Sequence, residues 1–283
     1  MHYDPVKYTL AKLLRGRILR RAFHLGLDLL FLRAWYVRKE LKRIKTDILH
    51  FVQDESAQFQ IPNSKLQILD AGMGFGQYSD RLARLFPAAR LVGLEIDKAH
   101  LYGGEAYFRA VHPDFRFTVG DVQILPFKSS SFDLIVTVDV MEHIPDDRAT
   151  FAEYARVLRP GGRLLMHTPR DTTPVGSSHD HDHWEVGEHV RDGYRDADAK
   201  EKMETAGLTI ERIVRGYGKP GMVAWTLLQR VPMSLLGTSR AFIPVVMLWL
   251  PIVIIPAVIA MYLDRAPGDR PEGGSLMVIA RKN

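Results

Sequence analysis

The chain has 283 residues, of which 46% are hydrophobic, 25% are charged and none is cysteine. The lack of cysteine excludes disulfides, zinc–thiolate sites, iron–sulfur clusters and cysteine nucleophiles. The length allows one large domain or two small ones, and the ordinary charge content argues against a disordered chain or a membrane protein with many spans. The formal net charge of +5 is unevenly distributed, because residues 1–50 carry a net charge of +8 and the remainder of the chain carries −3.

Residues 1–60 are predicted to form a basic, amphipathic helical region, because apolar and basic side chains alternate there at helical spacing. The apolar positions include Leu10, Leu13, Leu14, Ile18, Leu19, Leu27, Leu30 and Phe31, and the basic ones include Arg15, Arg17, Arg20, Arg21, Arg38 and Lys39. Two interpretations are open: attachment to an anionic membrane surface with Trp35 and Tyr36 at the interface, or a helical cap over the core with a solvated basic face.

Nucleic-acid binding is not favoured, since no recognition motif accompanies the basic residues. A signal peptide is not expected, because Asp28 interrupts the apolar stretch.

From Leu66 onward, short apolar runs alternate with helical segments. Strands are expected at 66–70, 90–97, 115–121, 132–140 and 162–169. Helices are expected at 78–86, after the second strand to about residue 110, and at 149–158. Strands that alternate with helices imply parallel strands joined by right-handed crossovers, so the pattern predicts a doubly wound α/β sheet. Asp133 is expected to cap or bridge the start of its strand rather than to bind a ligand.

A glycine-rich turn joins the first of these strands to the first helix. The segment ILDAGMGFG places Asp70, Gly72, Gly74 and Gly76 at this junction, where a ligand can approach a backbone that carries no Cβ atoms. Glu95 ends the second strand, where a carboxylate can accept hydrogen bonds from both ribose hydroxyls. A dinucleotide enzyme would have its third glycine one residue later, and an acid before the loop would repel a pyrophosphate but suit a cationic ligand. A cationic ligand is therefore favoured at this turn, and a nicotinamide dinucleotide is the runner-up.

The sequence resembles the class I S-adenosylmethionine-dependent methyltransferases, particularly the group that includes the ubiquinone, menaquinone and sterol methyltransferases. The resemblance covers about Lys65 to Ile213 and depends on LDAGMGFG, GLEID, GDVQILPFKSSSFDLIVTVDVMEHI and RVLRPGGRLLMHTP. It implies a Rossmann-like, mostly parallel seven-stranded sheet, with residues 61–218 and 275–283 as the methyltransferase domain. The last two strands, 208–218 and 275–283, would be antiparallel neighbours at one edge of the sheet.

The resemblance also implies roles for individual residues in binding the cofactor S-adenosylmethionine. Asp70 and the glycine-rich turn would hold its methionine part, Glu95 the ribose and Asp121 the adenine amino group, and Asp139 would lie nearest the methyl group. The complete set of cofactor-binding residues implied in this way is Asp70, Ala71, Gly72, Gly74, Gly76, Glu95, Ile96, Gly120, Asp121, Val122 and Asp139.

The acceptor side is less constrained, because in-line methyl transfer depends largely on positioning. An oxygen, nitrogen or carbon acceptor can require a base, and the candidates are His143, His167, His189 and Tyr194, near the carboxyl ends of strands. His143, His189 and Tyr194 are the predicted catalytic residues. By the resemblance, His189, Arg191 and Tyr194 belong to a segment that closes over the substrate.

The segment SSHDHDHW raises the question of a metal site. His179, His181 and His183 alternate with acids, so an extended backbone would place the three imidazoles on one face. The resembled group transfers methyl groups without a metal, and no metal is expected here.

The segment 219–274 is predicted to be a hydrophobic, membrane-associating insertion between the last two strands. Ala241 to Leu263 contains 23 residues without a charge, which is enough to span a bilayer. Both ends of the insertion must leave the domain on the same side, so a single crossing is excluded. In-plane or re-entrant attachment is favoured, because Pro244, Pro251 and Pro256 would break a straight helix. A hairpin of two spans, a soluble lid over the pocket and an oligomer interface are the alternatives.

These features predict a membrane-associated S-adenosylmethionine-dependent methyltransferase that acts on a lipid-like, quinone or polyprenyl acceptor, with its catalytic domain at the cytoplasmic face of a membrane. One alternative is a methyltransferase for a soluble sugar or natural product, with the insertion as an oligomer interface. Another is a cofactor-binding membrane adaptor without catalytic activity.

Overall fold

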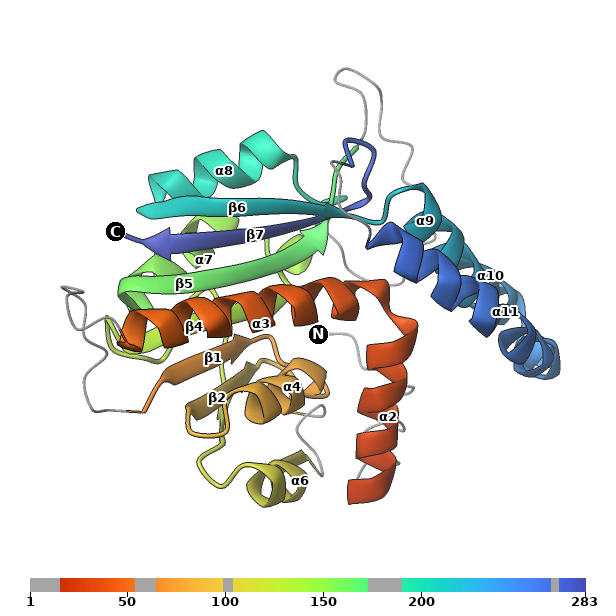
Figure 1. Ribbon diagram of the computed structural model, residues 1–283, viewed down its shortest axis with the longest axis horizontal. Coiled ribbons are helices and arrows are strands. Elements are labelled where there is room, and N and C mark those ends of the chain that lie inside the picture. The colour runs from red at the N-terminus through yellow and green to blue at the C-terminus, as the bar shows by residue number, and fades with distance from the viewer. Residues whose placement is uncertain (1–15, 54–64, 99–103, 173–189, 266–269) are drawn as a thin grey trace.

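A computed structural model describes residues 16–53, 65–98, 104–172, 190–265 and 270–283 of the chain. Its centre is a seven-stranded sheet in the order β3-β2-β1-β4-β5-β7-β6 (Figure 1). The strands are β1 (Gln67–Ala71), β2 (Arg90–Glu95), β3 (Arg116–Val119), β4 (Phe132–Val138), β5 (Leu158–Pro169), β6 (Leu208–Gly216) and β7 (Ser275–Lys282). The first five strands are parallel, whereas β7 is antiparallel to both β5 and β6. The predicted doubly wound sheet and its antiparallel last pair are confirmed.

Helices connect and cover the strands. They are α2 (Arg17–Leu30), α3 (Leu32–Gln53), α4 (Gln77–Leu85), α6 (Gly104–Val111), α7 (Asp147–Val157), α8 (Asp196–Thr205), α9 (Lys219–Trp225), α10 (Val231–Thr238) and α11 (Ile243–Asp264), with short turns η1 (Met141–His143), η2 (Thr226–Arg230) and η3 (Arg240–Phe242). Local sequence explains where some of them begin. Asp146 caps α7, because its Oδ1 accepts a hydrogen bond of 3.0 Å from the amide of Ala149.

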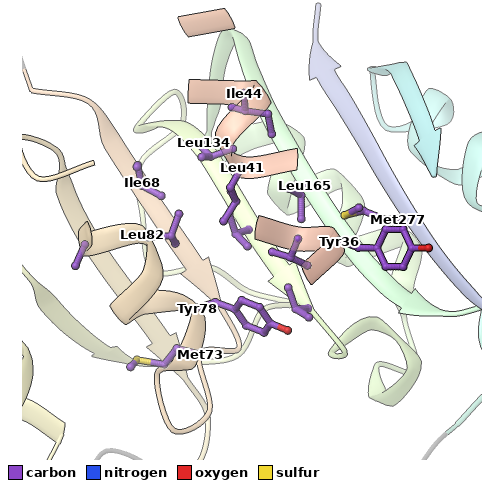
Figure 2. Close-up of a cluster of buried hydrophobic side chains, with 14 of the residues drawn as sticks. Tyr36, Leu41, Ile44, Ile68, Met73, Tyr78, Leu82, Leu134, Leu165 and Met277 are labelled. Carbon is purple, nitrogen blue, oxygen red and sulfur yellow. The ribbon is translucent and has the colours of Figure 1, made fainter. Parts of the chain in front are cut away.

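The two faces of the sheet bury different side chains, because neighbouring residues of a strand point in opposite directions. In β1, Ile68 packs with α3 and α4 on one face, whereas Leu69 packs with α7 and α8 on the other. Figure 2 shows the first cluster, in which Leu41 and Ile44 of α3 lie over the strands. Helix α3 is therefore part of the core, as expected for a helical cap.

Asp133 fixes the start of β4. Its carboxylate accepts a hydrogen bond of 2.8 Å from the amide of Gln67 and pairs with the Arg159 guanidinium through both oxygens, at 2.8 and 2.9 Å. The expectation that Asp133 bridges its strand is confirmed.

The segment between β6 and β7 forms a helical hairpin that projects from the edge of the domain (Figure 1). Helix α9, the π-helical turn η2 and α10 lead outward, and α11 returns. Asp264 joins the two ends of the hairpin, since its carboxylate accepts hydrogen bonds of 3.1 Å from the amides of Tyr217 and Gly221 and one of 2.7 Å from the Tyr36 hydroxyl. Both ends of the insertion therefore leave the domain at one place.

Helix α11 is continuous, so the prediction that prolines would break it is wrong. Pro244 lies in the first turn, where a missing amide costs nothing. Pro251 and Pro256 lie inside the helix and have no amide to donate to the carbonyls of Met247 and Ile252, four residues earlier. Met247 and Ile252 are both exposed. The outgoing half of the hairpin also departs from ideal α-helical geometry, because η2 is π-helical. The Trp249 indole of α11 donates a hydrogen bond of 2.9 Å to the Leu227 carbonyl in this turn.

Candidate active site

The glycine-rich turn after β1 adopts backbone conformations that favour glycine. Gly72, Gly74 and Gly76 have φ angles of +81°, +51° and +84°. A Cβ atom on Gly72 would lie 2.4 Å from Val140, and one on Gly76 would lie 2.4 Å from Phe108, so the packing of the protein requires both glycines. A Cβ on Gly74 would meet nothing within 4 Å. The backbone at Gly74 is thus bordered by open space, which fits the close approach of a ligand.

Two acidic side chains flank this turn. Asp70 is buried, and its Oδ2 accepts a hydrogen bond of 2.5 Å from the Ser79 hydroxyl. Burial is the main reason that the pKa of Asp70 is raised to about 7, with the nearby Glu95 adding to the effect. Glu95, at the end of β2, accepts hydrogen bonds from the amides of Gly74 at 2.8 Å and Asp97 at 3.0 Å. Glu95 therefore shapes the turn as well as offering lone pairs to a ligand.

The remaining predicted cofactor residues lie along the same edge of the sheet. Ala71 ends β1 in register with Leu94 of β2, and Ile96 follows β2 with an exposed side chain. After β3, the Gly120 amide donates to the Glu95 carbonyl at 3.2 Å, Asp121 accepts from the Gln123 amide at 2.9 Å, and Val122 is buried. Acids at three successive strand ends beside an open glycine turn fit S-adenosylmethionine, whose ammonium, ribose and adenine each offer hydrogen-bond donors. The individual roles of these residues stay predictions.

Helix α2 covers the glycine-rich turn. The Arg20 guanidinium donates to the Phe75 carbonyl at 3.1 Å, His24 Nε2 lies 3.1 Å from the same oxygen, and the Gln77 amide donates to Asp28 at 2.9 Å. The assignment of Arg20 to a solvated basic face is wrong, because its side chain is 1% exposed. A carbonyl more than 50 residues away accepts a hydrogen bond from its guanidinium, and no local pattern in the sequence signals that contact.

A second polar group lies where β4 and β5 end. Asp139 follows β4 in a left-handed conformation, with φ of +53°. Its Oδ1 lies 2.7 Å from His167 Nδ1, and its Oδ2 lies 2.6 Å from Arg33 Nη1. Burial alone would raise the pKa of Asp139, but the Arg33 guanidinium and the His167 imidazole hold it at about 2. Asp139 is therefore an anion between two nitrogen groups.

These three side chains line a cavity of about 210 Å³. Its other walls come from Pro169, Tyr217, Met222, Trp225, Gln229, Gly274 and Ser275. Arg33 belongs to α3, and Met222, Trp225 and Gln229 belong to the first half of the hairpin. The cavity thus has a charged end at the sheet and a more apolar wall from the insertion. Arg33 was not among the predicted site residues, because only the packing of α3 across the sheet brings it to Asp139.

The predicted catalytic residues are placed differently from one another. His143 lies in η1 and is exposed, and its charge contributes to the low pKa of Asp139. Tyr194 is fully buried, and its hydroxyl donates to Asp147 at 2.8 Å while accepting from Arg191 at 2.8 Å. Burial raises the pKa of Tyr194 well above its usual value, so the hydroxyl keeps its proton near neutral pH and the phenolate that could act as a base is not formed. These contacts are structural, and a role for Tyr194 in catalysis stays a prediction.

Several candidates lie outside the described residues. These are His189, which was predicted to be catalytic, and the three histidines considered as metal ligands, His179, His181 and His183. Within the described parts of the chain, no group of three or more histidine, aspartate or glutamate side chains is arranged to hold a metal ion.

Comparison with known proteins agrees with this geometry. Residues 69–166 match the methyltransferase-domain family. The malonyl-[acyl-carrier protein] O-methyltransferase of Hahella chejuensis is 34% identical over 128 residues, covering 43% of this chain and 44% of the relative. The ubiquinone biosynthesis O-methyltransferase of the same organism is 30% identical over 144 residues, covering 48% and 56%. The chain therefore spans about half the length of the curated relatives that it matches.

The fold also matches solved structures. Phosphoethanolamine N-methyltransferase 2 of Haemonchus contortus, in complex with S-adenosyl-L-methionine, superimposes with a TM-score of 0.54 at 16% identity, covering 84% of this chain and 52% of the other. At that identity the likeness concerns the fold alone. Residues 69–166 thus match a methyltransferase domain, and the sheet around them has the fold of a solved methyltransferase. This result favours S-adenosylmethionine over the nicotinamide alternative.

Proposed function

We propose that the chain is an S-adenosylmethionine-dependent methyltransferase that works at a membrane surface and methylates a lipid-like, quinone or polyprenyl acceptor. The observation that carries this proposal is that the cavity beside Asp139 shares a wall with the hairpin, through Met222, Trp225 and Gln229. The apolar part of an acceptor could then lie along the hairpin while its methyl-accepting group enters the cavity beside Asp139.

The outer side of the hairpin supports attachment to lipid. The described residues contain one helix that is long and apolar enough to cross a membrane, Arg240–Asp264, and 17% of its apolar window is buried. Ile252 and Ile255 are 72% and 68% exposed, and Met247 and Leu248 are similarly open. Contiguous exposed apolar surface of this kind is rare on soluble monomers and typical of membrane or protein contacts. Because both hairpin ends meet at Asp264, a single crossing does not fit. Only one helix of the described residues is long and apolar enough to span, so a re-entrant or in-plane insertion is favoured over a hairpin of two spans.

Helix α2 adds to the same surface, since it contacts α11 and lies on the hairpin side of the molecule (Figure 1). Its buried side holds the glycine-rich turn, and its outer side exposes Ile18, Leu25 and Leu29. Arg17 and Arg21, also exposed, lie on the same helix. Apolar residues next to arginines suit an anionic lipid surface, and they support a position at the cytoplasmic face of a membrane.

The cofactor part of the proposal is tested by calorimetry with S-adenosylhomocysteine. Asp70→Ala and Glu95→Ala are each expected to weaken binding at least about tenfold, because each removes a carboxylate from the predicted cofactor site. Asp121→Ala serves as a third variant, and circular dichroism checks that each variant is folded. If the wild-type chain prefers NADH or binds neither nucleoside, the cofactor assignment is contradicted.

The acceptor part is tested by transfer of a labelled methyl group to a total lipid extract. A labelled product in the organic phase is the expected result, and its identity gives the acceptor class. A product that stays in the aqueous phase would favour a soluble acceptor, with the hairpin as an interface between copies. Absence of turnover with both lipid and soluble extracts would favour a membrane adaptor without catalytic activity.

A further inference from the structure

His167 combines features that are typical of a base. It lies in β5, where its carbonyl accepts a hydrogen bond of 2.9 Å from the Asp139 amide and its backbone is in register with Val138 of β4. The positions of the imidazole and the Asp139 carboxylate are thus fixed by the sheet. The side chain is 3% exposed and lines the 210 Å³ cavity.

The hydrogen bonds of His167 define the state of its two nitrogens. Nδ1 faces the Asp139 carboxylate at 2.7 Å, and that carboxylate also pairs with Arg33. An anionic carboxylate can only accept, so Nδ1 carries the proton and donates it to Asp139. In the neutral imidazole Nε2 then holds the lone pair, and it has no hydrogen-bond partner among the described residues. A buried nitrogen without a partner is costly in a purely structural histidine.

We propose that His167 is the general base of the reaction and that the acceptor is methylated on a hydroxyl oxygen. This inference depends on the proposed methyltransferase function. The acceptor hydroxyl gives its proton to His167 Nε2, and the oxygen forms a bond to the donor's methyl carbon. The sulfur keeps the electron pair of the broken C–S bond and becomes a neutral thioether. The imidazolium is stabilised by Asp139 and later loses its proton to water.

The size of the cavity identifies the part of the acceptor that enters it. A cavity of roughly 150 Å³ accommodates a benzene ring, so 210 Å³ accommodates one ring with small substituents. A longer apolar tail does not fit, and it would lie outside along the wall that Met222 and Trp225 contribute. The cavity therefore suits the hydroxylated ring of an amphipathic acceptor, with Arg33 placed to stabilise a developing oxyanion.

A chromophoric phenol tests the base without the methyl donor. 4-Nitrophenol absorbs at a longer wavelength when it is ionised, so its absorbance reports whether the bound hydroxyl has lost its proton. We expect the full chain to bind the probe and ionise it below its solution pKa, and we expect His167→Gln to abolish that shift. Equal ionisation with wild type and His167→Gln would overturn the assignment of His167 as the base. If the wild-type chain does not bind the probe, the assignment of the cavity to a ring is overturned.

Methyl transfer to the acceptor found in the lipid extract gives a second readout. His167→Gln should lower kcat/KM by about 10² to 10⁴ and remove the limb of the pH profile that reports the imidazole, while affinity for S-adenosylhomocysteine stays within twofold. His143→Gln is the matched comparison, because His143 is the exposed histidine near the same carboxylate. If His143→Gln removes this limb of the pH profile and His167→Gln does not, the assignment of His167 as the base is wrong while the proposed function stands. If wild type transfers no methyl group and binds no S-adenosylhomocysteine, the proposed function itself fails.

Discussion

Helices α3 and α11 have the same length of 22 residues but opposite relations to the core. Helix α3 is rich in charge, and Val37, Leu41 and Ile44 on one side are all buried in the cluster that they share with the strands. Helix α11 is apolar all round, yet most of its outer side chains are exposed. Burial therefore follows position on the fold and not apolar content. The exposed apolar residues of α11 are the observation behind the proposed membrane attachment.

The largest effect is expected from placing a charge on the buried side of α11. Met261→Asp should lower the free energy of unfolding by at least about 4 kcal/mol, because Met261 is fully buried in the core cluster and an unpaired carboxylate there loses its hydration. Denaturant unfolding measures the change. Ile259→Asp is the matched control at a position that is 55% exposed, and it should leave the domain folded. Equal destabilisation by both variants would contradict the division of α11 into a packed and an open side.

The next effect concerns α3. Leu41→Ala should cost about 2 to 5 kcal/mol of unfolding free energy, since it removes a fully buried side chain from the face shown in Figure 2. Ile255→Ala, on the open side of α11, should change the same quantity by about 0.5 kcal/mol or less. Thermal or urea unfolding compares the two. A small effect of Leu41→Ala would mean that α3 is not a core helix.

The third effect is expected at Asp70 and depends on pH. Its pKa is about 7 in the folded chain, above its ordinary value of 3.8, mainly because it is buried. Folding therefore favours the protonated carboxyl, and stability falls as the pH rises from about 4 to about 7 and stays lower above that. Asp70→Asn should remove this decline and be more stable than wild type at pH 8, by up to about 4 kcal/mol.

Urea unfolding at pH 5 and pH 8 tests this sign, with Glu105→Gln as a control at an exposed acid on α6. The same Asp70→Asn variant should bind S-adenosylhomocysteine more weakly. A variant that is less stable than wild type at pH 8 would show that the carboxylate is stabilised by contacts rather than strained by burial.

The sequence predicted those features that depend on short stretches of chain. The glycine-rich turn, the acids at strand ends and the seven strands each have a local pattern. The structure places the turn and the acids together at the carboxyl ends of the parallel strands. Arg20 and Arg33 could not be placed, because their partners Phe75 and Asp139 are brought to them only by packing. His167 was one of four candidate bases, and only the pairing of β4 with β5 sets it beside Asp139, 28 residues earlier.

The prolines of α11 show a different limit. The three prolines predicted a broken helix, but α11 is continuous, because a proline in the first turn costs nothing and two exposed turns tolerate lost hydrogen bonds. What the sequence did specify was that the ends of the insertion must meet. Asp264 fulfils that requirement through Tyr217, Gly221 and Tyr36.

Vesicle flotation tests the central claim most directly. The full wild-type chain is mixed with vesicles that contain an anionic phospholipid and is compared with a double variant, Ile252→Lys with Ile255→Lys, whose folding and S-adenosylhomocysteine affinity are checked first. The account predicts that wild type floats with the vesicles and that the variant binds at least about tenfold more weakly, because lysine is costly inside a bilayer. Folded wild-type protein that stays entirely in the lipid-free fraction would contradict the account.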